Sequence, residues 1–355
     1  MYSLFVRRLP VENPSNRFAE SEVVYLEGED VPQAELEVYF DKSGSVLAKN
    51  DSPDVGFDFS VNPYRGCFHG CAYCYARPTH EYLSFGAGTD FERKIVVKRD
   101  APELLRKALS AKGWRGDVVM FSGVTDCYQP LEARYRLTRA CLEVCAEYNN
   151  PARVITKSAL VERDIDVLLR ARASVAVSIP FASEAHARAL EPYVTTPARR
   201  MKTIERLAKA GVAVGVSVAP IIPGLTDEEF PEILSRARDA GATFAFYVLL
   251  RLPGHVRDVF ESRIRAALPD KAERVLSHVK QSRMSRDGGK MYDATFGKRG
   301  TGEGPYADAI AKLFDATAKR LGFGEAANAM TTRATTREEG ATSGFAARGQ
   351  LPLFR

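Results

Sequence analysis

The sequence predicts an α/β fold, a partial TIM-like (βα)6 barrel, and three observations support this prediction. Short apolar segments alternate with segments of helical periodicity from residue 57 to residue 253. This alternation is typical of parallel strands joined by crossover helices. The alternation of strand and helix patterns is absent from the polar residues before 56 and changes after 253. With 355 residues, the chain is long enough for one barrel of about 200–250 residues with appendages, or for two domains.

The predicted strands are short, rich in Val, Ile, Phe or Ala, and flanked by Gly, Pro, Ser or Thr. They are 57–61, 118–122, 152–156, 174–179, 212–218 and 243–250. Helical patterns lie between them, at 101–112, 132–148, 162–172, 197–210 and 227–240. Residues 78–100 form an insertion, in which the alternating segment 94–98 predicts a short extra strand or a flap near the mouth of the site. In barrels of this kind, the chemistry lies on loops that follow the carboxyl ends of the strands.

The regions outside the barrel of residues 56–253 differ from it in pattern. Residues 1–55 are polar, contain four prolines and show no sustained period, so we expect an N-terminal arm that wraps the barrel. Helical patterns at 258–267, 270–284 and 305–321 predict a small helical C-terminal extension over 254–323. Residues 324–349 contain almost no large apolar side chains and cannot build a core, so we expect a disordered tail over 324–355.

Composition favours an intracellular enzyme. Hydrophobic residues make up 45% of the chain and charged residues 27%, which is ordinary for a soluble globular protein. Six cysteines, three of them in one motif, do not make a disulfide framework. The net charge of +5 permits a nucleic-acid partner without requiring one. Residues 1–10 lack the apolar core of a signal peptide, and the most apolar stretch, 211–224, is too short to cross a membrane. We therefore expect a cytoplasmic protein with no membrane partner.

Three cysteines close together in the chain form the most informative motif. Cys67, Cys71 and Cys74 are separated by three and then two residues. Iron–sulfur clusters are held by cysteine thiolates, and a complete four-iron cube normally takes four of them. A set of three leaves one iron without a protein ligand, and an open position is typical of a catalytic metal site. The spacing therefore indicates a catalytic iron–sulfur cluster.

The alternative for this motif is a zinc site that is completed by a distant fourth ligand. His69, His80 and Cys127 are the candidates for that ligand. Zinc motifs usually combine two pairs of ligands, and no second pair is present because Cys141 and Cys145 lie on one face of a helical pattern. We expect these last two cysteines to be buried packing residues.

Four further segments extend the motif into a wider similarity. They are 62–67 (Asn-Pro-Tyr-Arg-Gly-Cys), 75–82 (Tyr-Ala-Arg-Pro-Thr-His-Glu-Tyr), 156–159 (Thr-Lys-Ser-Ala) and 219–224 (Ala-Pro-Ile-Ile-Pro-Gly). With the cysteines, they resemble the DNA-repair-photolyase-like radical S-adenosylmethionine (SAM) proteins, a bacterial subfamily related to the spore photoproduct lyases, over about three quarters of the chain. The resemblance implies a 4Fe–4S cluster on the three cysteines. It also implies that SAM binds the free iron and is cleaved to a 5′-deoxyadenosyl radical, and that an electron donor such as flavodoxin or ferredoxin reduces the cluster.

The resemblance also implies which residues bind SAM. Tyr73 would lie beside the adenine, and the segment 122–126 would receive the amino group, because an ammonium prefers the oxygens of residues such as Thr125 and Asp126. Lys157 would contact the carboxylate or a ribose oxygen. Ser178 would contact the ribose, and Arg199 or Arg200 would contact the carboxylate. Ile221 and the two residues before it would lie beneath the adenine. Ser122 and Gly123 would lie around the amino group. The alternative roles are helix capping, solvated charge and barrel packing.

Cys127 is a candidate for the hydrogen-atom donor, with Tyr128 as a second candidate. Cys127 follows Asp126 at the predicted mouth of the site, where a thiol could return a hydrogen atom to a substrate radical. The spore photoproduct lyases carry a cysteine on this loop just ahead of the Ser/Thr-Asp pair, but Gly123 stands at that place here. The lyase reaction itself is therefore not implied, and the alternative role for Cys127 is packing.

Two regions suggest macromolecular partners. The loop 283–306 carries five basic residues and six glycines with interleaved aromatic residues, a mixture that suits a phosphate backbone but is equally common on solvated surfaces. The C-terminal residues Gln350, Leu351, Leu353 and Phe354 resemble the bacterial sliding-clamp-binding motif, with Pro352 as a small departure. Large apolar side chains are unfavourable to expose unless something binds them. Residues 324–349 would then act as a tether of roughly 25–30 Å. The alternatives are a tail that folds back on the protein and a chance match.

The favoured function is a radical SAM enzyme that acts on a nucleic acid in a reaction like DNA repair. The second hypothesis is radical chemistry on a protein, peptide or metabolite, which gains if the site is too narrow for a flipped-out nucleotide. The third is a metal-binding protein without catalysis.

Overall fold

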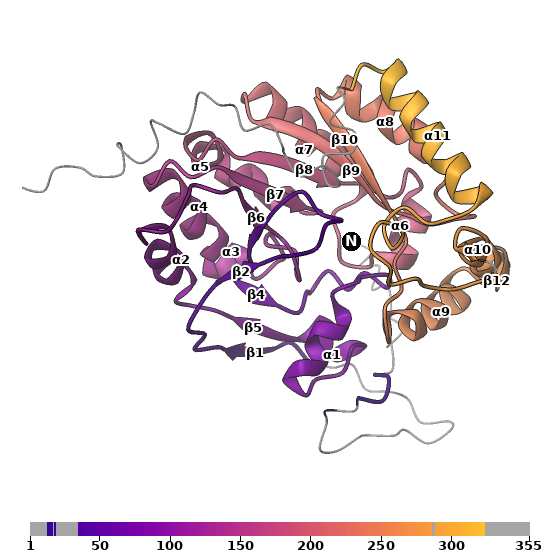
Figure 1. The fold of residues 1–355 in the computed structure, drawn as a ribbon, viewed down its shortest axis with the longest axis horizontal. Coiled ribbons are helices and arrows are strands. Elements are labelled where there is room, and N and C mark those ends of the chain that lie inside the picture. Colours follow the sequence, from indigo (N-terminus) through magenta and orange to yellow (C-terminus); the bar gives the residue numbers. More distant parts are fainter. Residues whose placement is uncertain (1–12, 17, 19–34, 286–287, 324–355) are drawn as a thin grey trace, which may run out of the picture.

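Six parallel strands that are adjacent in chain order form the centre of the fold (Figure 1). The computed structural model describes residues 13–16, 18, 35–285 and 288–323. The six strands are β3 (Phe59–Val61), β6 (Val119–Phe121), β7 (Ala152–Thr156), β8 (Ser174–Ser178), β9 (Ala213–Ile221) and β10 (Phe244–Leu249). Each coincides with a predicted strand, so the predicted succession of six strand–helix units is confirmed. A seventh strand, β2 (Leu47–Lys49), pairs antiparallel with β3 at the edge of the same sheet.

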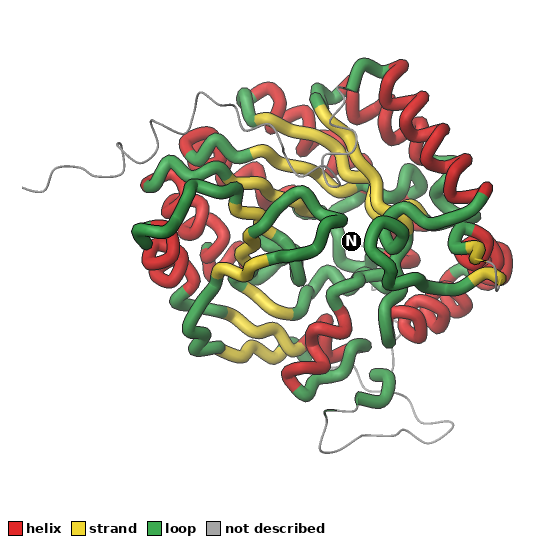
Figure 2. Tube along the Cα trace, in the orientation of Figure 1, coloured by secondary structure: helices red, strands yellow, loops and turns green. Residues whose placement is uncertain are grey.

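Helices cover the outer face of this sheet (Figure 2). The helices that share an apolar core with the sheet are α2 (Ala101–Leu109), α4 (Leu137–Glu147), α5 (Ile165–Arg170), α7 (Pro197–Lys209), α8 (Phe230–Asp239) and α11 (Pro305–Arg320). Helices α6 (Glu184–Leu190), α9 (Val256–Ala267) and α10 (Pro269–Gln281) bury their apolar side chains in a second cluster, and the short α3 (Glu132–Tyr135) precedes α4. A 3₁₀ helix over Ala159–Asp164 precedes α5. The three helical patterns predicted after residue 253 correspond to α9, α10 and α11, while the predicted domain boundaries stay predictions.

The predicted helix over 132–148 is two helices. The chain breaks at Arg136, whose φ of 53° is left-handed. The carboxylate of Glu132 accepts hydrogen bonds from the backbone N–H groups of Thr138 and Arg139, at 2.9 and 3.2 Å. Glu132 thus satisfies backbone donors at the start of the second helix from within the first. The apolar period lies in α4, whereas α3 buries Glu132, so the pattern does not show where the first helix ends.

The insertion builds a second, three-stranded sheet. Its strand β5 (Lys94–Val97) pairs in parallel with β1 (Glu37–Phe40) of the N-terminal arm and antiparallel with β4 (Tyr64–Arg65). The extra strand predicted in the insertion is therefore confirmed. A 3₁₀ helix over Arg77–Leu83 and helix α1 (Thr89–Arg93) precede β5. Farther along the chain, β11 (Met284–Ser285) and β12 (Gly288–Gly289) form a short antiparallel pair.

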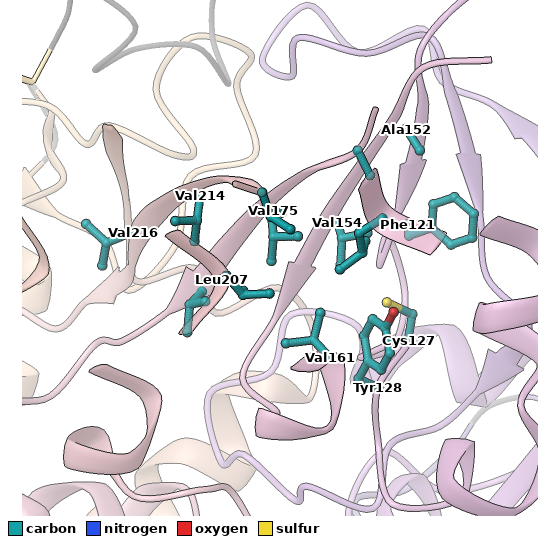
Figure 3. Close-up of a cluster of buried hydrophobic side chains, with 14 of the residues drawn as sticks. Phe121, Cys127, Tyr128, Ala152, Val154, Val161, Val175, Leu207, Val214 and Val216 are labelled. Atoms are coloured by element: carbon teal, nitrogen blue, oxygen red, sulfur yellow. The ribbon is translucent and has the colours of Figure 1, made fainter. Parts of the chain in front are cut away.

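The main core lies between the parallel sheet and its outer helices. Figure 3 shows Val175 and Val214 from neighbouring strands near Leu207 of α7, and Val154 of the next strand near Val161. Fully burying one such side chain contributes about 1.5–3 kcal/mol. Cys141 and Cys145 of α4 are also fully buried there, as predicted. No helix in the described ranges combines the length and apolar character needed to cross a membrane.

Candidate active site

A cavity of about 420 Å³ lies at the carboxyl ends of the parallel strands. Its walls include residues that follow or end each of the six strands, because parallel strands bring all their carboxyl ends to the same side. Cys67, Cys71 and Cys74 all line it, and none of the three is in a disulfide. This size is within the range of pockets that bind small molecules.

The cysteine loop is held by a buried arginine that the sequence did not indicate. Arg77 is fully buried, and its guanidinium donates hydrogen bonds to the carbonyl of Cys71 at 2.8 and 3.1 Å. It also reaches the carbonyls of Ala87 and Gly88, both at 2.9 Å, and pairs with Glu92 at 2.6 Å. One charged group therefore fixes the loop against the insertion, in a geometry that satisfies nearly all its donors.

The donor set fits an iron–sulfur cluster better than a single metal ion. Within the described ranges, no three His, Cys, Asp or Glu side chains converge on one point, as a zinc ion would need. A four-iron cube is instead ligated at separate corners, so its thiolates need not converge. Of the candidate fourth zinc ligands, His69 lines the cavity with the cysteines, while His80 and Cys127 do not. His69 Nδ1 is 3.4 Å from Asp126 Oδ2, His80 Nε2 is 2.8 Å from the carbonyl of Lys94, and Cys127 lies in the main core.

Asp126 organises the loops that follow β6 and β7. Its Oδ1 accepts a hydrogen bond from Thr156 Oγ1 at 2.7 Å, and its Oδ2 accepts one from the backbone N–H of Lys157 at 2.8 Å. Burial alone would raise the pKa of Asp126, but the neighbouring His69 and these hydrogen bonds outweigh burial and lower the pKa to about 2. Asp126 is therefore an ionised residue on the cavity wall whose oxygens already have protein partners.

The rest of the segment 122–126 also lines the cavity, but most of its polar side chains hold the loop itself. Thr125 Oγ1 donates to the carbonyl of Gly66 at 2.6 Å and so ties the segment to the cysteine loop. Ser122 Oγ accepts from the backbone N–H of Cys127 at 3.0 Å. The carbonyl of Gly123 accepts from the Tyr75 hydroxyl at 2.6 Å.

Lys157 and Ser178 come together on the cavity wall, at the ends of neighbouring strands. Lys157 Nζ donates to Ser178 Oγ at 2.9 Å and lies 3.4 Å from the carbonyl of Ala219. Ala219 and Pro220 line the cavity beside them, and Ile221 does not, because its side chain faces the main core. The predicted apolar floor thus consists of the first two residues of that segment only.

Glu191 is a site residue that the sequence did not indicate. This buried carboxylate accepts a hydrogen bond from the Tyr73 hydroxyl, pairs with Arg200 at 2.5 Å and lies 4.0 Å from Lys157 Nζ. It therefore links the aromatic residue of the cysteine motif to the lysine after β7. Glu191 follows a short helix and belongs to no periodic pattern, so only the structure reveals it.

Neither predicted arginine reaches the cavity, which corrects their assignment to the carboxylate of SAM. Arg200 is fully buried and donates to the carbonyl of Ser178 at 2.7 Å as well as to Glu191. Arg199 pairs with Glu162 at 2.5 and 2.9 Å on the helical side of the sheet. Both guanidinium groups therefore support the barrel.

Cys127 and Tyr128 are also placed differently from the prediction. Both are fully buried in the main core and neither lines the cavity (Figure 3). The loop turns back at this point, and the carbonyl of Cys127 accepts a hydrogen bond from Thr138 Oγ1 at 2.6 Å. Burial raises the pKa of the Cys127 thiol well above its ordinary value. The structure therefore favours the packing role over a hydrogen-donor role for both residues.

Three basic side chains of the loop after α10 are bonded to other protein groups. Arg283 is buried and donates to the carbonyls of Leu250 and Arg299, at 2.5 and 3.1 Å. Lys298 pairs with Glu303 at 2.8 Å, and Arg299 pairs with Asp54 of the N-terminal arm. The loop therefore connects the arm to the barrel, and Arg299 is one of its residues that line the cavity. The clamp-binding-like residues Gln350, Leu351, Leu353 and Phe354 lie outside the described residues.

Comparison with known proteins identifies the family. The model of the Radical SAM superfamily matches residues 61–237, which contain the three cysteines and most of the cavity wall. The chain belongs to the radical SAM superfamily. Enzymes of this superfamily use a 4Fe–4S cluster and SAM, so the predicted family and its cofactors are confirmed.

Relatives from distant organisms share part of the sequence. An uncharacterized protein of Mycobacterium tuberculosis is 38% identical over 224 residues, which cover 61% of this chain and 66% of the relative. An uncharacterized protein of Methanocaldococcus jannaschii is 30% identical over 183 residues, 51% of this chain and 67% of that protein. The chain thus spans slightly less than two thirds of the mycobacterial relative.

Solved structures of spore photoproduct lyase have a similar fold. A variant with bound AdoMet (SAM) and dinucleoside spore photoproduct is 18% identical, with a TM-score of 0.58, covering 82% of this chain and 80% of that one. The lyase complexed with dinucleoside spore photoproduct is 17% identical, with a TM-score of 0.57 and the same coverage. At these identities the likeness establishes the radical SAM fold.

The position of Lys157 leads to a prediction for cofactor binding. Lys157→Ala should weaken SAM binding about tenfold or more, because it removes a charge-assisted donor from the cavity wall. Its thermal midpoint should stay nearly unchanged, since Glu191 keeps its pair with Arg200. Calorimetric titration of the reconstituted protein with SAM, alongside a thermal scan, measures both quantities. Lys202→Ala, at an exposed lysine of α7, is the control. A large drop in midpoint with normal SAM affinity would mean that Lys157 serves the barrel instead.

Proposed function

We propose that this protein is a radical SAM enzyme whose substrate is a nucleic acid. The observation that carries the proposal is the charge of the cavity wall. Among the described residues, four cationic side chains line the cavity against one carboxylate, Asp126; the cations are Lys49, Lys157, Arg251 and Arg299. Two of them have acidic neighbours, since Arg299 pairs with Asp54 and Lys157 lies 4.0 Å from Glu191, which leaves Lys49 and Arg251 as the cations without such a neighbour in the described part of the chain. Phosphate groups dominate the affinity of proteins for nucleic acids, and they are attracted by such an excess of positive charge.

Two further features support a nucleic-acid substrate. Aromatic side chains, Phe57, Tyr75 and Phe246, stand among these cations on the cavity wall, a combination that suits stacking of bases. Spore photoproduct lyase, which shares the fold, has been solved in complex with dinucleoside spore photoproduct. A nucleotide would enter such a cavity after it leaves its stack, as in other enzymes that act on bases.

The residues have distinct roles in this proposal. Cys67, Cys71 and Cys74 would hold the cluster, and Lys157 and Ser178 would orient SAM. When bound and reduced, these cofactors supply a 5′-deoxyadenosyl radical that abstracts a hydrogen atom from the substrate. Arg77 keeps the cysteine loop in place, while Glu191 holds Tyr73 and Lys157 on the wall. The remaining walls position the substrate and limit the access of water.

Substrate dependence of SAM cleavage tests the proposal. Deproteinised bacterial nucleic acid should raise the rate of 5′-deoxyadenosine formation by the reduced, reconstituted protein at least about tenfold, because a bound substrate orients the reacting groups. Nuclease treatment of the sample should remove this stimulation, and protease treatment should leave it intact. Stimulation that survives nuclease but not protease would favour the peptide or protein substrate instead. Liquid chromatography with mass spectrometry quantifies the product.

A further inference from the structure

Arg251 is placed at the carboxyl end of β10, where it lines the cavity. Its guanidinium carbon lies 5.2 Å from the centre of the Tyr75 ring. The Tyr75 ring is itself fixed, because its hydroxyl donates to the carbonyl of Gly123 at 2.6 Å. An aromatic ring under a guanidinium stabilises its charge and holds its plane while leaving its edge donors free.

Those donors have no protein acceptor among the described residues. No hydrogen bond or ion pair joins Arg251 to a described residue, and its Nε is buried without a partner. The Nε atoms of Arg200 and Arg283 are also buried without a partner among the described residues, but other nitrogens of these two arginines are bonded, in Arg200 to Glu191 and in Arg283 to the carbonyl of Leu250. Arg77 pairs with Glu92 and Arg299 with Asp54, so Arg251 differs in that none of its nitrogens has a partner among the described residues. Leaving a buried charged donor unsatisfied is unfavourable, so this exception indicates a ligand with an oxyanion.

The other charges around the cavity do not supply that oxyanion. Asp126 is occupied by Thr156, His69 and the backbone of Lys157. Lys157 lies near Glu191, and Arg299 is neutralised by Asp54, so these cations have acidic neighbours already. Besides Arg251, only exposed Lys49 at the end of β2 lines the cavity as a cation without an acidic partner in the described part of the chain.

We propose that Arg251, supported by the Tyr75 ring, forms a subsite for a backbone phosphate of the substrate. The planar fork of a guanidinium matches two oxygens of a phosphodiester, which it can bind with two parallel hydrogen bonds. This inference rests on the proposed nucleic-acid function and deepens it by assigning one phosphate to one residue. The position beside Tyr75 also places that phosphate next to the cysteine loop, so the nucleotide it belongs to lies at the cluster end of the cavity.

Binding of a labelled single-stranded decamer of thymidylate tests the subsite. Arg251→Gln should weaken binding of this decamer to the SAM-loaded, reconstituted protein by about tenfold or more, as measured by fluorescence anisotropy at fixed salt. Arg251→Lys keeps the charge but loses the planar guanidinium fork, so its affinity for the decamer should lie between those of the wild-type protein and Arg251→Gln. Lys312→Gln removes the same charge from an exposed position on α11, outside the cavity, and should change affinity less than about twofold.

A decamer with neutral methylphosphonate linkages tests the atom that is recognised. The wild-type protein should bind it weakly, and Arg251→Gln should weaken that binding no further, because the charged oxygens that Arg251 contacts are gone. SAM affinity and the thermal midpoint of each variant are measured in parallel. If Arg251→Gln does not fold, then Arg251→Lys and the neutral decamer on the wild-type protein still decide the question.

Three results would overturn the subsite in distinguishable ways. Equal binding of the charged decamer by Arg251→Gln and the wild-type protein would remove the subsite but leave the proposed function intact. Loss of SAM affinity with unchanged decamer affinity would assign Arg251 to the carboxylate of SAM. If the wild-type protein binds no decamer at all, then both the subsite and the nucleic-acid function fail.

Discussion

Replacing any one of Cys67, Cys71 and Cys74 by alanine should abolish the bound cluster. All three line the cavity as free thiols, and a cube that is left with two thiolates and open irons loses its attachment to the protein. Iron content should fall to background in each variant, together with the visible absorption of the thiolate-bound cluster. Iron analysis and absorption spectra after anaerobic reconstitution check this result.

Cys127→Ala provides the matched control for these variants. Its thiol is buried in the main core, away from the cavity, so the cluster should form at the wild-type level. The substitution should lower stability by about 1–2 kcal/mol, because it leaves a small void in a packed core. Loss of iron from Cys127→Ala would instead make Cys127 a fourth ligand of the cluster and contradict the open iron position that the three cysteines imply.

Glu191→Ala should lower the free energy of unfolding by about 3–5 kcal/mol. Glu191 and Arg200 are both fully buried at their side chains and lie 2.5 Å apart, so removal of the carboxylate leaves an uncompensated guanidinium in the interior. Tyr73 loses its acceptor in the same variant. Denaturant titration measures the stability change. Glu232→Ala, which breaks an exposed pair with Arg236, should change stability by less than about 1 kcal/mol.

A double variant distinguishes the effect of the Glu191–Arg200 pair on stability from the effects of neighbouring residues. Arg200→Met added to Glu191→Ala removes the unpaired charge and should recover part of the lost stability, because a buried pair is often replaceable by apolar groups. Glu191→Gln should also weaken SAM binding, because the neutral amide no longer attracts Lys157. A purely structural role of Glu191 would leave the SAM affinity unchanged. Full SAM affinity in Glu191→Gln together with wild-type stability in Glu191→Ala would contradict the assigned role.

The strands and the strand-end residues could be predicted because each depends on a local pattern. Short β-branched segments between turn residues gave the six strands, and the parallel order then placed Lys157 beside Ser178. The cysteine spacing likewise carries its chemistry in the sequence itself. Predicting these features does not require the direction in which a loop side chain points.

The directions in which loop and helix side chains point were harder to predict from the sequence. Cys127 follows a strand end, but the loop turns back and buries it under Thr138. Arg200 shares a helical face with Ile204 and Leu207, both buried, so the period of α7 already contained the signal that it faces inward. The roles of Glu191 and Arg77 depend on partners from other segments, and the role of Arg251 depends on its lack of a described partner. No local sequence pattern contains that information.

The central claim is that three cysteines on the cavity wall support reductive cleavage of SAM. The most direct measurement is 5′-deoxyadenosine formed by the reconstituted protein after anaerobic reduction, compared with Cys71→Ala under the same conditions. The account predicts 5′-deoxyadenosine together with methionine from the wild-type protein and only background from the variant. A fully loaded, reduced wild-type protein that leaves SAM intact, or a variant that cleaves SAM equally well, would contradict it.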